Sequence, residues 1–192
     1  MIELITTLDF YILNAIQNMR NGFFDTIMPV ITFMGSGGAV WILIAIIMIC
    51  FKKSRKYGII IGAALLIGFI FSTNILKELV GRERPFNTEG ALLTAQNLLI
   101  GIPSGRYSFP SGHTISSFSS AAAVFMYSKR YGIGAYILAV LISFSRLYLY
   151  VHFPSDVIAG AVLGILITVL SRFIVNKIWE KINERKLSNN TR

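Results

Sequence analysis

Three groups of polar residues interrupt the long apolar stretches of this chain and carry the side chains that could do chemistry. They are Lys77 with Arg84, the run 110–113, and the segments 145–146 and 152–156. Both histidines of the chain belong to these groups. Cations are costly in water-poor surroundings, so their presence at the ends of apolar segments indicates an anion held for chemistry. Phosphate is the anion that these residues suit best.

Lys77 and Arg84 are two cations that can reach the same place. They stand seven residues apart, which is two turns of a helix and puts both on one face. Pro85 disfavours helical geometry at Arg84, so we expect the helix to fray there and the guanidinium to reach back. By itself, such a pair at a helix end is more often an interfacial anchor.

Residues 110–113, Pro-Ser-Gly-His, precede an apolar-periodic run and therefore predict the start of a helix, with Ser111 near the cap position. Free backbone N–H groups and the helix dipole make such a start an anion site, and Gly112 permits close approach of a phosphate oxygen. A Ser-Gly helix start is common, and a lone histidine can be a hydrogen-bonded core residue. His113 gains meaning only beside the other two groups.

His152 and Asp156 stand four residues apart, with Pro154 between them at a position that suits the first turn of a helix. A carboxylate placed there can accept a hydrogen bond from one imidazole nitrogen. That contact fixes the tautomer and leaves the other nitrogen free to attack. A structural His-Asp pair that caps a helix is the alternative interpretation.

Together the groups supply what phosphoryl transfer requires. They offer a nucleophile, an orienting carboxylate, a second histidine able to act as general acid, and three cations, of which Arg146 is the third. The sequence shows no cluster of acids or of His and Cys ligands that suggests a catalytic metal. We therefore expect no cofactor, with the cations in the place of a metal.

The composition indicates a membrane protein. Of the 192 residues, 54% are hydrophobic and only 14% are charged, and this length suits one membrane-embedded domain over residues 1–192. The formal charge of +9 would favour nucleic-acid binding on a soluble protein. Here the basic residues flank apolar segments, so we expect the bilayer and no nucleic acid as partner.

The apolar runs predict an all-α integral membrane bundle of six transmembrane helices. The glycines at 35–38 suggest a tight turn between antiparallel helices, and the segment 8–19 has the spacing of an amphipathic helix that lies on the membrane surface or extends the first span. The six predicted spans are about 23–35, 38–51, 58–76, 110–128, 132–145 and 154–175.

Basic residues predict the orientation. They cluster at 52–56, at 129–130 and in the tail 172–192, so the positive-inside rule places these ends and both termini in the cytoplasm. All three polar groups then face outside. The long interval 86–109 is expected to cover the site, with a short amphipathic helix over 89–100. Arg106 is a candidate contact for a second phosphate.

In three motifs the chain resembles the type 2 phosphatidic acid phosphatase superfamily. The match covers about 80 residues and is carried by the following motifs: Lys77-x6-Arg84-Pro85, Pro110-Ser111-Gly112-His113, and Ser145-Arg146-x5-His152-x3-Asp156. Metal independence is a trait of that family, which agrees with the absence of a predicted metal site.

The resemblance also implies roles for individual residues. His152 attacks phosphorus to form a phosphohistidine, Asp156 orients it, and His113 protonates the leaving oxygen and later activates water. The resemblance implies that the phosphate oxygens are held by Lys77, Arg84, Arg146, Ser111 and the backbone at Gly112.

The membrane branch of this family includes bacterial undecaprenyl diphosphate phosphatases and phosphatidylglycerophosphate phosphatases. An outward site suits recycling of a polyprenyl diphosphate carrier, so undecaprenyl diphosphate is the preferred lipid phosphate substrate and phosphatidylglycerophosphate the alternative. The motifs themselves do not name the lipid, and no protein partner can be inferred.

Two hypotheses from other classes remain. An anion or lipid transporter could bind phosphate without cleaving it, although transporters usually place their sites near the midplane between repeated halves. A vanadate-dependent haloperoxidase shares the three-part signature, but those enzymes are soluble and this chain has long apolar spans.

Overall fold

The computed structural model describes residues 2–103 and 105–190, and every regular element in these ranges is helical. The predicted all-α class is therefore confirmed. The elements in chain order are α1 (Ile2–Gln17), α2 (Gly22–Gly35), η1 (Ser36–Gly38), α3 (Ala39–Cys50), α4 (Arg55–Ile70), η2 (Phe71–Leu76), α5 (Lys77–Val80), η3 (Pro85–Asn87), η4 (Ala95–Asn97), α6 (Gly112–Tyr127), α7 (Lys129–Tyr148) and α8 (Pro154–Asn190).

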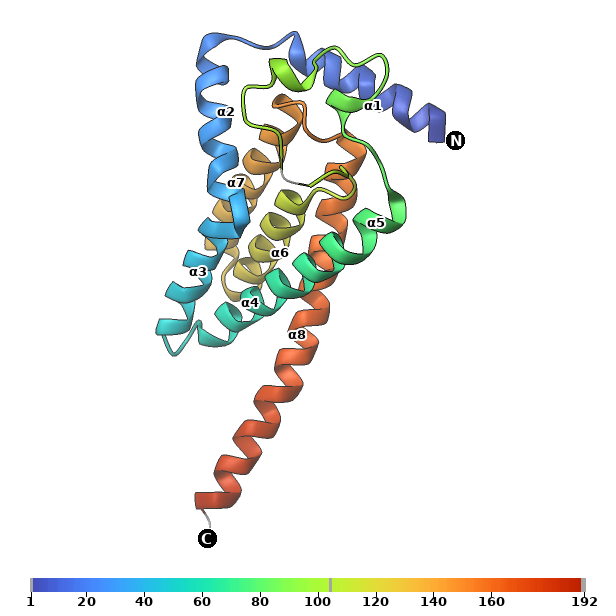
Figure 1. Cartoon of the computed structure of the whole chain (residues 1–192). Helices are drawn as coiled ribbons and strands as arrows, with labels where there is room; N and C mark the ends of the chain where they lie inside the picture. Colours follow the sequence, from blue (N-terminus) through green and yellow to red (C-terminus); the bar gives the residue numbers. More distant parts are fainter. Residues whose placement is uncertain (1, 104, 191–192) are drawn as a thin grey trace.

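The helix α6 forms the centre of the bundle and packs against α4, α7 and α8 (Figure 1). Its buried positions are mainly serine and alanine, whose small side chains let neighbouring backbones approach closely. One close approach is to α8, where a Cβ added at Gly164 would lie 2.8 Å from the carbonyl oxygen of Ile115. Close packing of small residues therefore holds together the helices that carry two of the three polar groups.

The prediction of a tight turn between antiparallel helices at 35–38 is wrong. Gly37 and Gly38 adopt positive φ angles of 60° and 72°, and α3 continues in the general direction of α2 after a kink (Figure 1). Length gives the physical reason. At 1.5 Å per residue neither half reaches across a hydrocarbon core of about 30 Å, whereas the two halves joined end to end do.

Within the described residues, four helical stretches are long and apolar enough to cross a membrane: Gly22–Cys50, Arg55–Asn87, Lys129–Tyr148 and Pro154–Glu184. The six predicted spans are not confirmed, because two of them form the single stretch Gly22–Cys50 and the central helix α6 is only 16 residues long. The N-terminal helix and the C-terminal end of α8 lie at opposite ends of the molecule (Figure 1). The orientation in the membrane, with both termini in the cytoplasm, stays a prediction.

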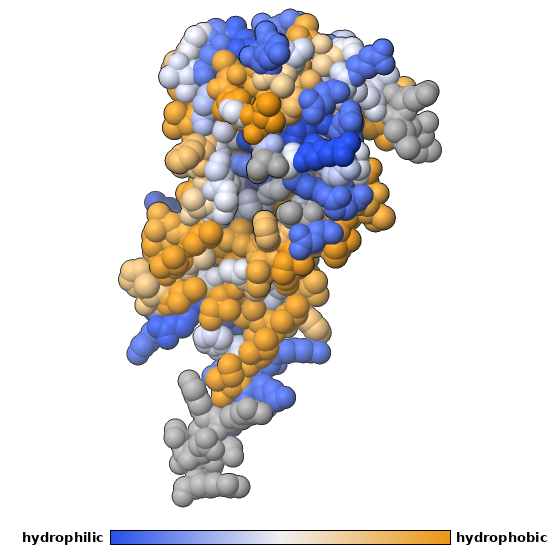
Figure 2. Space-filling view, viewed as in Figure 1, coloured by the Kyte–Doolittle hydropathy of each residue, from blue (hydrophilic) through white to orange (hydrophobic). Residues whose placement is uncertain are grey.

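Hydrophobic residues cover the middle of the face shown in Figure 2, and hydrophilic residues gather above and below them. Large apolar side chains of α3 and α4, such as Leu43, Ile46 and Phe69, are exposed. Such exposure is unfavourable in water and natural in lipid, so the bundle has the surface of a membrane protein.

The helix α1 lies across one end of the bundle (Figure 1). It presents Leu4, Leu8 and Tyr11 outward and buries Leu13 and Ile16 in a cluster with the chain after α7. The predicted helix in this segment is therefore present, and its buried face packs against the bundle. That face also carries the polar residues Asp9 and Gln17.

The segment 86–109 does not contain the expected helix over 89–100. Among its described residues the regular structure is the two short 3₁₀ turns η3 and η4, and Gly90 has a φ of 79° that interrupts helical geometry. Its apolar side chains, including Leu93, Leu98 and Ile100, pack against the same cluster as α1. The segment is thus an irregular cover over the end of the bundle.

Candidate active site

The first group of cations lies on α5 and on the segment that follows: Lys77 begins α5, and Arg84 comes after it. The helix ends at Gly81, which has a φ of 60°, and Arg84 is extended with φ −80° and ψ 153°. The predicted fraying before Pro85 is confirmed. Arg84 is buried, and its guanidinium donates to the carbonyl oxygens of Gly105 and Val151, each at 2.9 Å.

The helix α6 begins at Gly112 with Ser111 at the predicted cap position. The Ser111 hydroxyl accepts a hydrogen bond from Thr114 at 3.0 Å and does not cap the backbone. No atom outside its own stretch of chain lies within 4 Å of a Cβ built on Gly112, so the start of the helix is open on that side. His113 follows directly, with its Nε2 3.5 Å from the hydroxyl of Ser36.

The imidazole of His152 lies between an anion and a cation. Its Nδ1 is 3.5 Å from a carboxylate oxygen of Asp156, and its Nε2 is 3.5 Å from a guanidinium nitrogen of Arg84. The helix α8 begins at Pro154, as predicted. The Nδ1 contact is longer than a normal hydrogen bond, so Asp156 holds the ring only weakly. The Nε2 atom is the nitrogen that faces the cations.

Burial holds the pKa of His152 well below its ordinary value, and the positive charges of Arg84, Arg146 and Lys77 act in the same direction. The imidazole is 2% exposed and is therefore neutral near pH 7. A neutral ring has a free lone pair, which is what a nucleophile requires.

Arg146 reaches the site from the last turn of α7. Its residue is 4% exposed, and Nη1 donates to the Thr32 hydroxyl at 2.6 Å, so α2 helps to hold the guanidinium. Its buried Nε has no hydrogen-bond partner among the described residues. An unused donor on a buried cation is unfavourable, which makes this nitrogen suited to an anionic acceptor.

The three sequence groups meet in one place. Charge interactions connect His113 with cations and histidine from the other groups, and connect Lys77 with Arg84, Arg146 and Asp156. The predicted catalytic and substrate-binding residues therefore form one constellation at the end of the bundle that α1 covers. Arg106 is exposed, and its guanidinium lies over the ring of Tyr107, with the central carbon 5.3 Å from the ring centroid.

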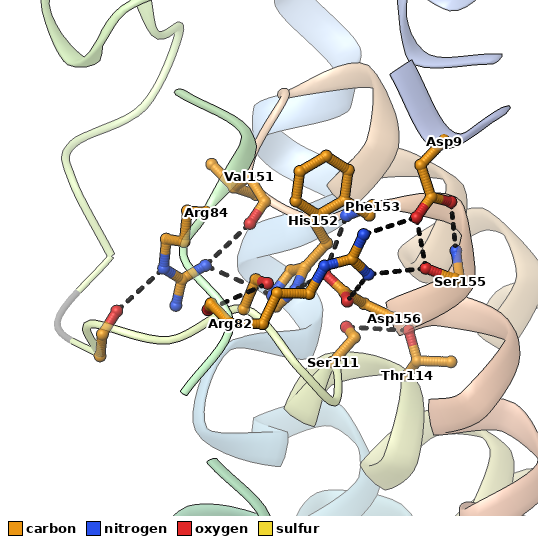
Figure 3. A network of polar contacts seen from close by, with 12 residues as sticks. Asp9, Arg82, Arg84, Ser111, Thr114, Val151, His152, Phe153, Ser155 and Asp156 are labelled. Carbon is orange, nitrogen blue, oxygen red and sulfur yellow. Dashed lines mark hydrogen bonds and ion pairs between the residues drawn. The ribbon is translucent and has the colours of Figure 1, made fainter. Parts of the chain in front are cut away.

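Sequence reasoning missed two charged residues of this constellation, Arg82 and Asp9 (Figure 3). Arg82 donates to Asp156 at 2.8 Å and to Asp9 at 2.7 Å. Arg82 stands only two positions before Arg84, which is a usable signal, but nothing in the sequence connects Asp9 with residues more than seventy positions away.

An apolar groove connects the constellation with the lipid-facing surface. It has a volume of about 700 Å³ and runs along α3 and α4, with Gly112 and His113 among its lining residues. Small residues form much of its wall: Gly35, Gly38, Ala45, Gly62, Ala64 and Gly68.

The described residues contain no group of three or more His, Cys, Asp or Glu side chains placed to hold a metal ion.

The family model of the PAP2 superfamily matches residues 56–180, which include all three groups. The chain belongs to the PAP2 superfamily. The predicted family is thus confirmed.

Relatives of this chain include lipid phosphatases. The chain is 36% identical to an undecaprenyl-diphosphatase of Sulfolobus acidocaldarius over 69% of its own length and 62% of that protein, so the match spans less than two thirds of that relative. It is 28% identical to a lipid A 4'-phosphatase of Bacteroides thetaiotaomicron over 95% and 83% of the two chains.

A solved structure has the same fold. The crystal structure of a transmembrane PAP2-type phosphatidylglycerolphosphate phosphatase from Bacillus subtilis matches with a TM-score of 0.70 and 26% identity, over 91% of this chain and 88% of that chain. The bundle is therefore that of a membrane PAP2 protein.

Proposed function

We propose that this chain hydrolyses a lipid phosphate or diphosphate through a phosphohistidine intermediate. The observation that carries the proposal is the apolar groove with His113 in its lining, because the charge of the buried cations also reaches His113. A groove of this kind suits a hydrocarbon chain, and the cations suit a phosphate group. A substrate that combines a hydrocarbon chain with a phosphate group occupies both the groove and the cation cluster.

The proposed reaction has two steps. Nε2 of His152 attacks phosphorus, an N–P bond forms, and the P–O bond to the lipid breaks while His113 donates a proton to the leaving oxygen. His113 then takes a proton from water, which attacks the phosphohistidine and releases inorganic phosphate. Asp156 stabilises the positive charge that develops on the His152 ring.

The cations have a separate role in this proposal. Lys77, Arg84 and Arg146 hold the equatorial phosphate oxygens, together with Ser111 and the backbone at Gly112. Charge and position are most of what phosphoryl transfer needs, so no metal is required in this scheme. The unused Nε of Arg146 supports the assignment, since a phosphate oxygen satisfies it.

Undecaprenyl diphosphate is the proposed substrate, with phosphatidylglycerophosphate as the alternative. Similarity to the Sulfolobus undecaprenyl-diphosphatase supports the first, and similarity to the Bacillus phosphatidylglycerolphosphate phosphatase supports the second. The basic turns at 52–56 and 129–130 lie at the end of the bundle away from the site, which supports an outward-facing site under the positive-inside rule.

The test is phosphate release by the purified protein in detergent with a chelator present. Undecaprenyl diphosphate, phosphatidylglycerophosphate, phosphatidate and lipid A are compared side by side. His152→Ala should lower the rate to background, whereas the control Cys50→Ser, an exposed residue at the far end of α3, should keep the wild-type rate. Retained turnover in His152→Ala would overturn the mechanism. Lipid flux into liposomes without phosphate release would favour a transporter.

A further inference from the structure

Arg82 links the N-terminal helix to the carboxylate beside the nucleophile. Its Nη1 donates to Asp156 Oδ1 at 2.8 Å and to the Ser155 hydroxyl at 2.7 Å, and its Nη2 donates to Asp9 Oδ2 at 2.7 Å (Figure 3). The other Asp156 oxygen is the one that faces Nδ1 of His152 and accepts the backbone N–H of Phe153 at 2.9 Å. Both carboxylates are buried, and the Arg82 side chain that joins them is 19% exposed.

The surroundings fix the guanidinium in place. Its central carbon lies 3.9 Å from the centroid of the Phe153 ring, and the Phe10 ring of α1 packs edge-on against Phe153 at 5.2 Å. Asp9 also accepts the backbone N–H of Ser155 at 2.9 Å. One turn of α1 therefore contacts both Arg82 and the first turn of α8, which carries Asp156.

We propose that Arg82 and Asp9 are positioning residues for catalysis, which act through Asp156 on His152. The inference rests on the proposed function, because it assigns how that nucleophile is oriented. Arg82 holds one oxygen of Asp156 by a hydrogen bond at 2.8 Å, so that the other oxygen stays directed at Nδ1 of His152. Asp9 fixes the orientation of the Arg82 guanidinium, so α1 contributes to the positioning of the catalytic residues.

The physical need for such a holder follows from the His152 contact. At 3.5 Å the imidazole holds Asp156 weakly, so orientation of the carboxylate must come from its other partners. Arg82 is the cation that hydrogen-bonds it. An arginine that bridges two carboxylates fixes direction as well as charge, which a lysine at the same place cannot do.

The experiment compares Arg82→Ala, Arg82→Lys and Asp9→Asn with the control Asn14→Ala. The control removes another polar contact of α1, the bond from the Tyr150 hydroxyl to Asn14, which does not reach the carboxylate. Each protein is checked for a single symmetric species in detergent before kinetics on undecaprenyl diphosphate or, if that is the lipid turned over, phosphatidylglycerophosphate.

We expect Arg82→Ala to lower kcat on the order of a hundredfold with KM changed less than threefold, since misorientation costs this much without affecting lipid binding. Asp9→Asn should lose roughly tenfold, Arg82→Lys should recover only part of the loss, and Asn14→Ala should match the wild type. The double variant of Asp9 and Arg82 should be no worse than Arg82→Ala, because the two act in one chain.

A pH profile separates positioning from simple anchoring of α1. The charged groups that face Asp156 are Arg82 from the segment after α5, His152 before α8, and, by charge, Lys77 and Arg84, while Asp9 of α1 acts through Arg82. Without Arg82 the carboxylate loses its hydrogen-bonded cation and can interact more strongly with the His152 ring, so the acid limb of kcat/KM, which follows protonation of His152, should move to higher pH. A helix that merely loosens would not move it.

The outcomes are distinct. If the wild-type protein releases no phosphate from any lipid, the proposed function fails. If it does, and Arg82→Ala or Asp9→Asn behaves like Asn14→Ala in kcat and pH profile, this inference alone is overturned. Should Arg82→Ala not yield a single species, the isosteric Asp9→Asn and the charge-conserving Arg82→Lys decide the matter.

Discussion

At the scale of single residues, the protonation of His152 governs the proposed chemistry. Its ring is enclosed, with cations on the Nε2 side and one carboxylate on the Nδ1 side. Cations beside a buried imidazole disfavour its protonated form, and they also attract the phosphate that it attacks. In the proposed mechanism the same charges therefore serve both substrate binding and nucleophile activation.

This arrangement predicts the acid side of the pH profile. The pKa of His152 is lowered, so the ring stays neutral as pH falls and becomes protonated only well below its ordinary value of about 6.5. Activity that needs the neutral ring should therefore persist to pH below about 6 and be lost as pH falls through the lowered pKa.

The measurement is kcat/KM against pH, together with nitrogen NMR of the labelled histidines. Arg84→Gln removes the cation that lies 3.5 Å from Nε2 and should shift the titration of His152 upward, with a parallel shift of the acid limb. A His152 that titrates near 6.5 in the unaltered protein would contradict the assignment.

Sequence reasoning found the residues of this site where the chemistry sits within one short motif. The four-residue step from His152 to Asp156 and the helix start at Gly112 have local geometries that a sequence can reveal. The link from Asp9 to Arg82 depends on how α1 docks, which is a tertiary contact with no local signal. For this reason the motif residues could be predicted, whereas the contact between Asp9 and Arg82 could not.

At the scale of elements, helix content could be predicted from apolar runs but helix direction could not. A glycine pair between two such runs is compatible with a reversal or with a kink, and only packing decides between them. In this chain Gly35 lies so close to α7 that an added Cβ would be 2.6 Å from the side chain of Ile142. The end of α2 therefore packs against α7 at the point where α3 begins, which is consistent with α2 and α3 forming a single membrane crossing.

Close approach of α8 to α6 predicts a specific sensitivity. A side chain at Gly164 would meet the backbone of α6, with the amide nitrogen of Ser119 at 3.0 Å from its Cβ. Backbone atoms of a central helix cannot move aside, so Gly164→Val should destabilise the protein by about 1–3 kcal/mol through overpacking.

The matched control is Gly134→Val on α7, where no atom lies within 4 Å of the added Cβ. Thermal unfolding of both variants in the same detergent provides the comparison. A clear drop in the midpoint is expected for position 164 alone, and equal midpoints would argue against a tight α6–α8 contact.

At the scale of the whole molecule, the groove connects an apolar environment with the charged site, as a lipid phosphate combines an apolar chain with a charged group. Its apolar wall belongs to α3 and α4, and its inner end lies at the start of α6. Composition predicted a membrane protein and the motifs predicted an anion site. The groove between them could not be predicted, because it depends on small residues that are distant in sequence and face one another only after folding.

Filling the groove should separate lipid recognition from chemistry. Gly62 lines the groove and has open space around it, so Gly62→Leu should be accommodated by the fold while it blocks the hydrocarbon chain. We expect KM for a long-chain lipid phosphate to rise about tenfold, which corresponds to loss of a few buried methylene groups. Turnover of a small soluble phosphate ester should be unchanged. Equal losses on both substrates would show that the groove does not hold the lipid.

The side of the groove that borders exposed Ile42 and Phe69 has a kinetic consequence. A reactant that slides in from the surrounding leaflet is supplied by two-dimensional diffusion, so the effective concentration is its mole fraction among neighbouring lipids. Diluting a vesicle preparation with buffer should leave the rate per protein unchanged, whereas diluting the leaflet with inert lipid should slow it.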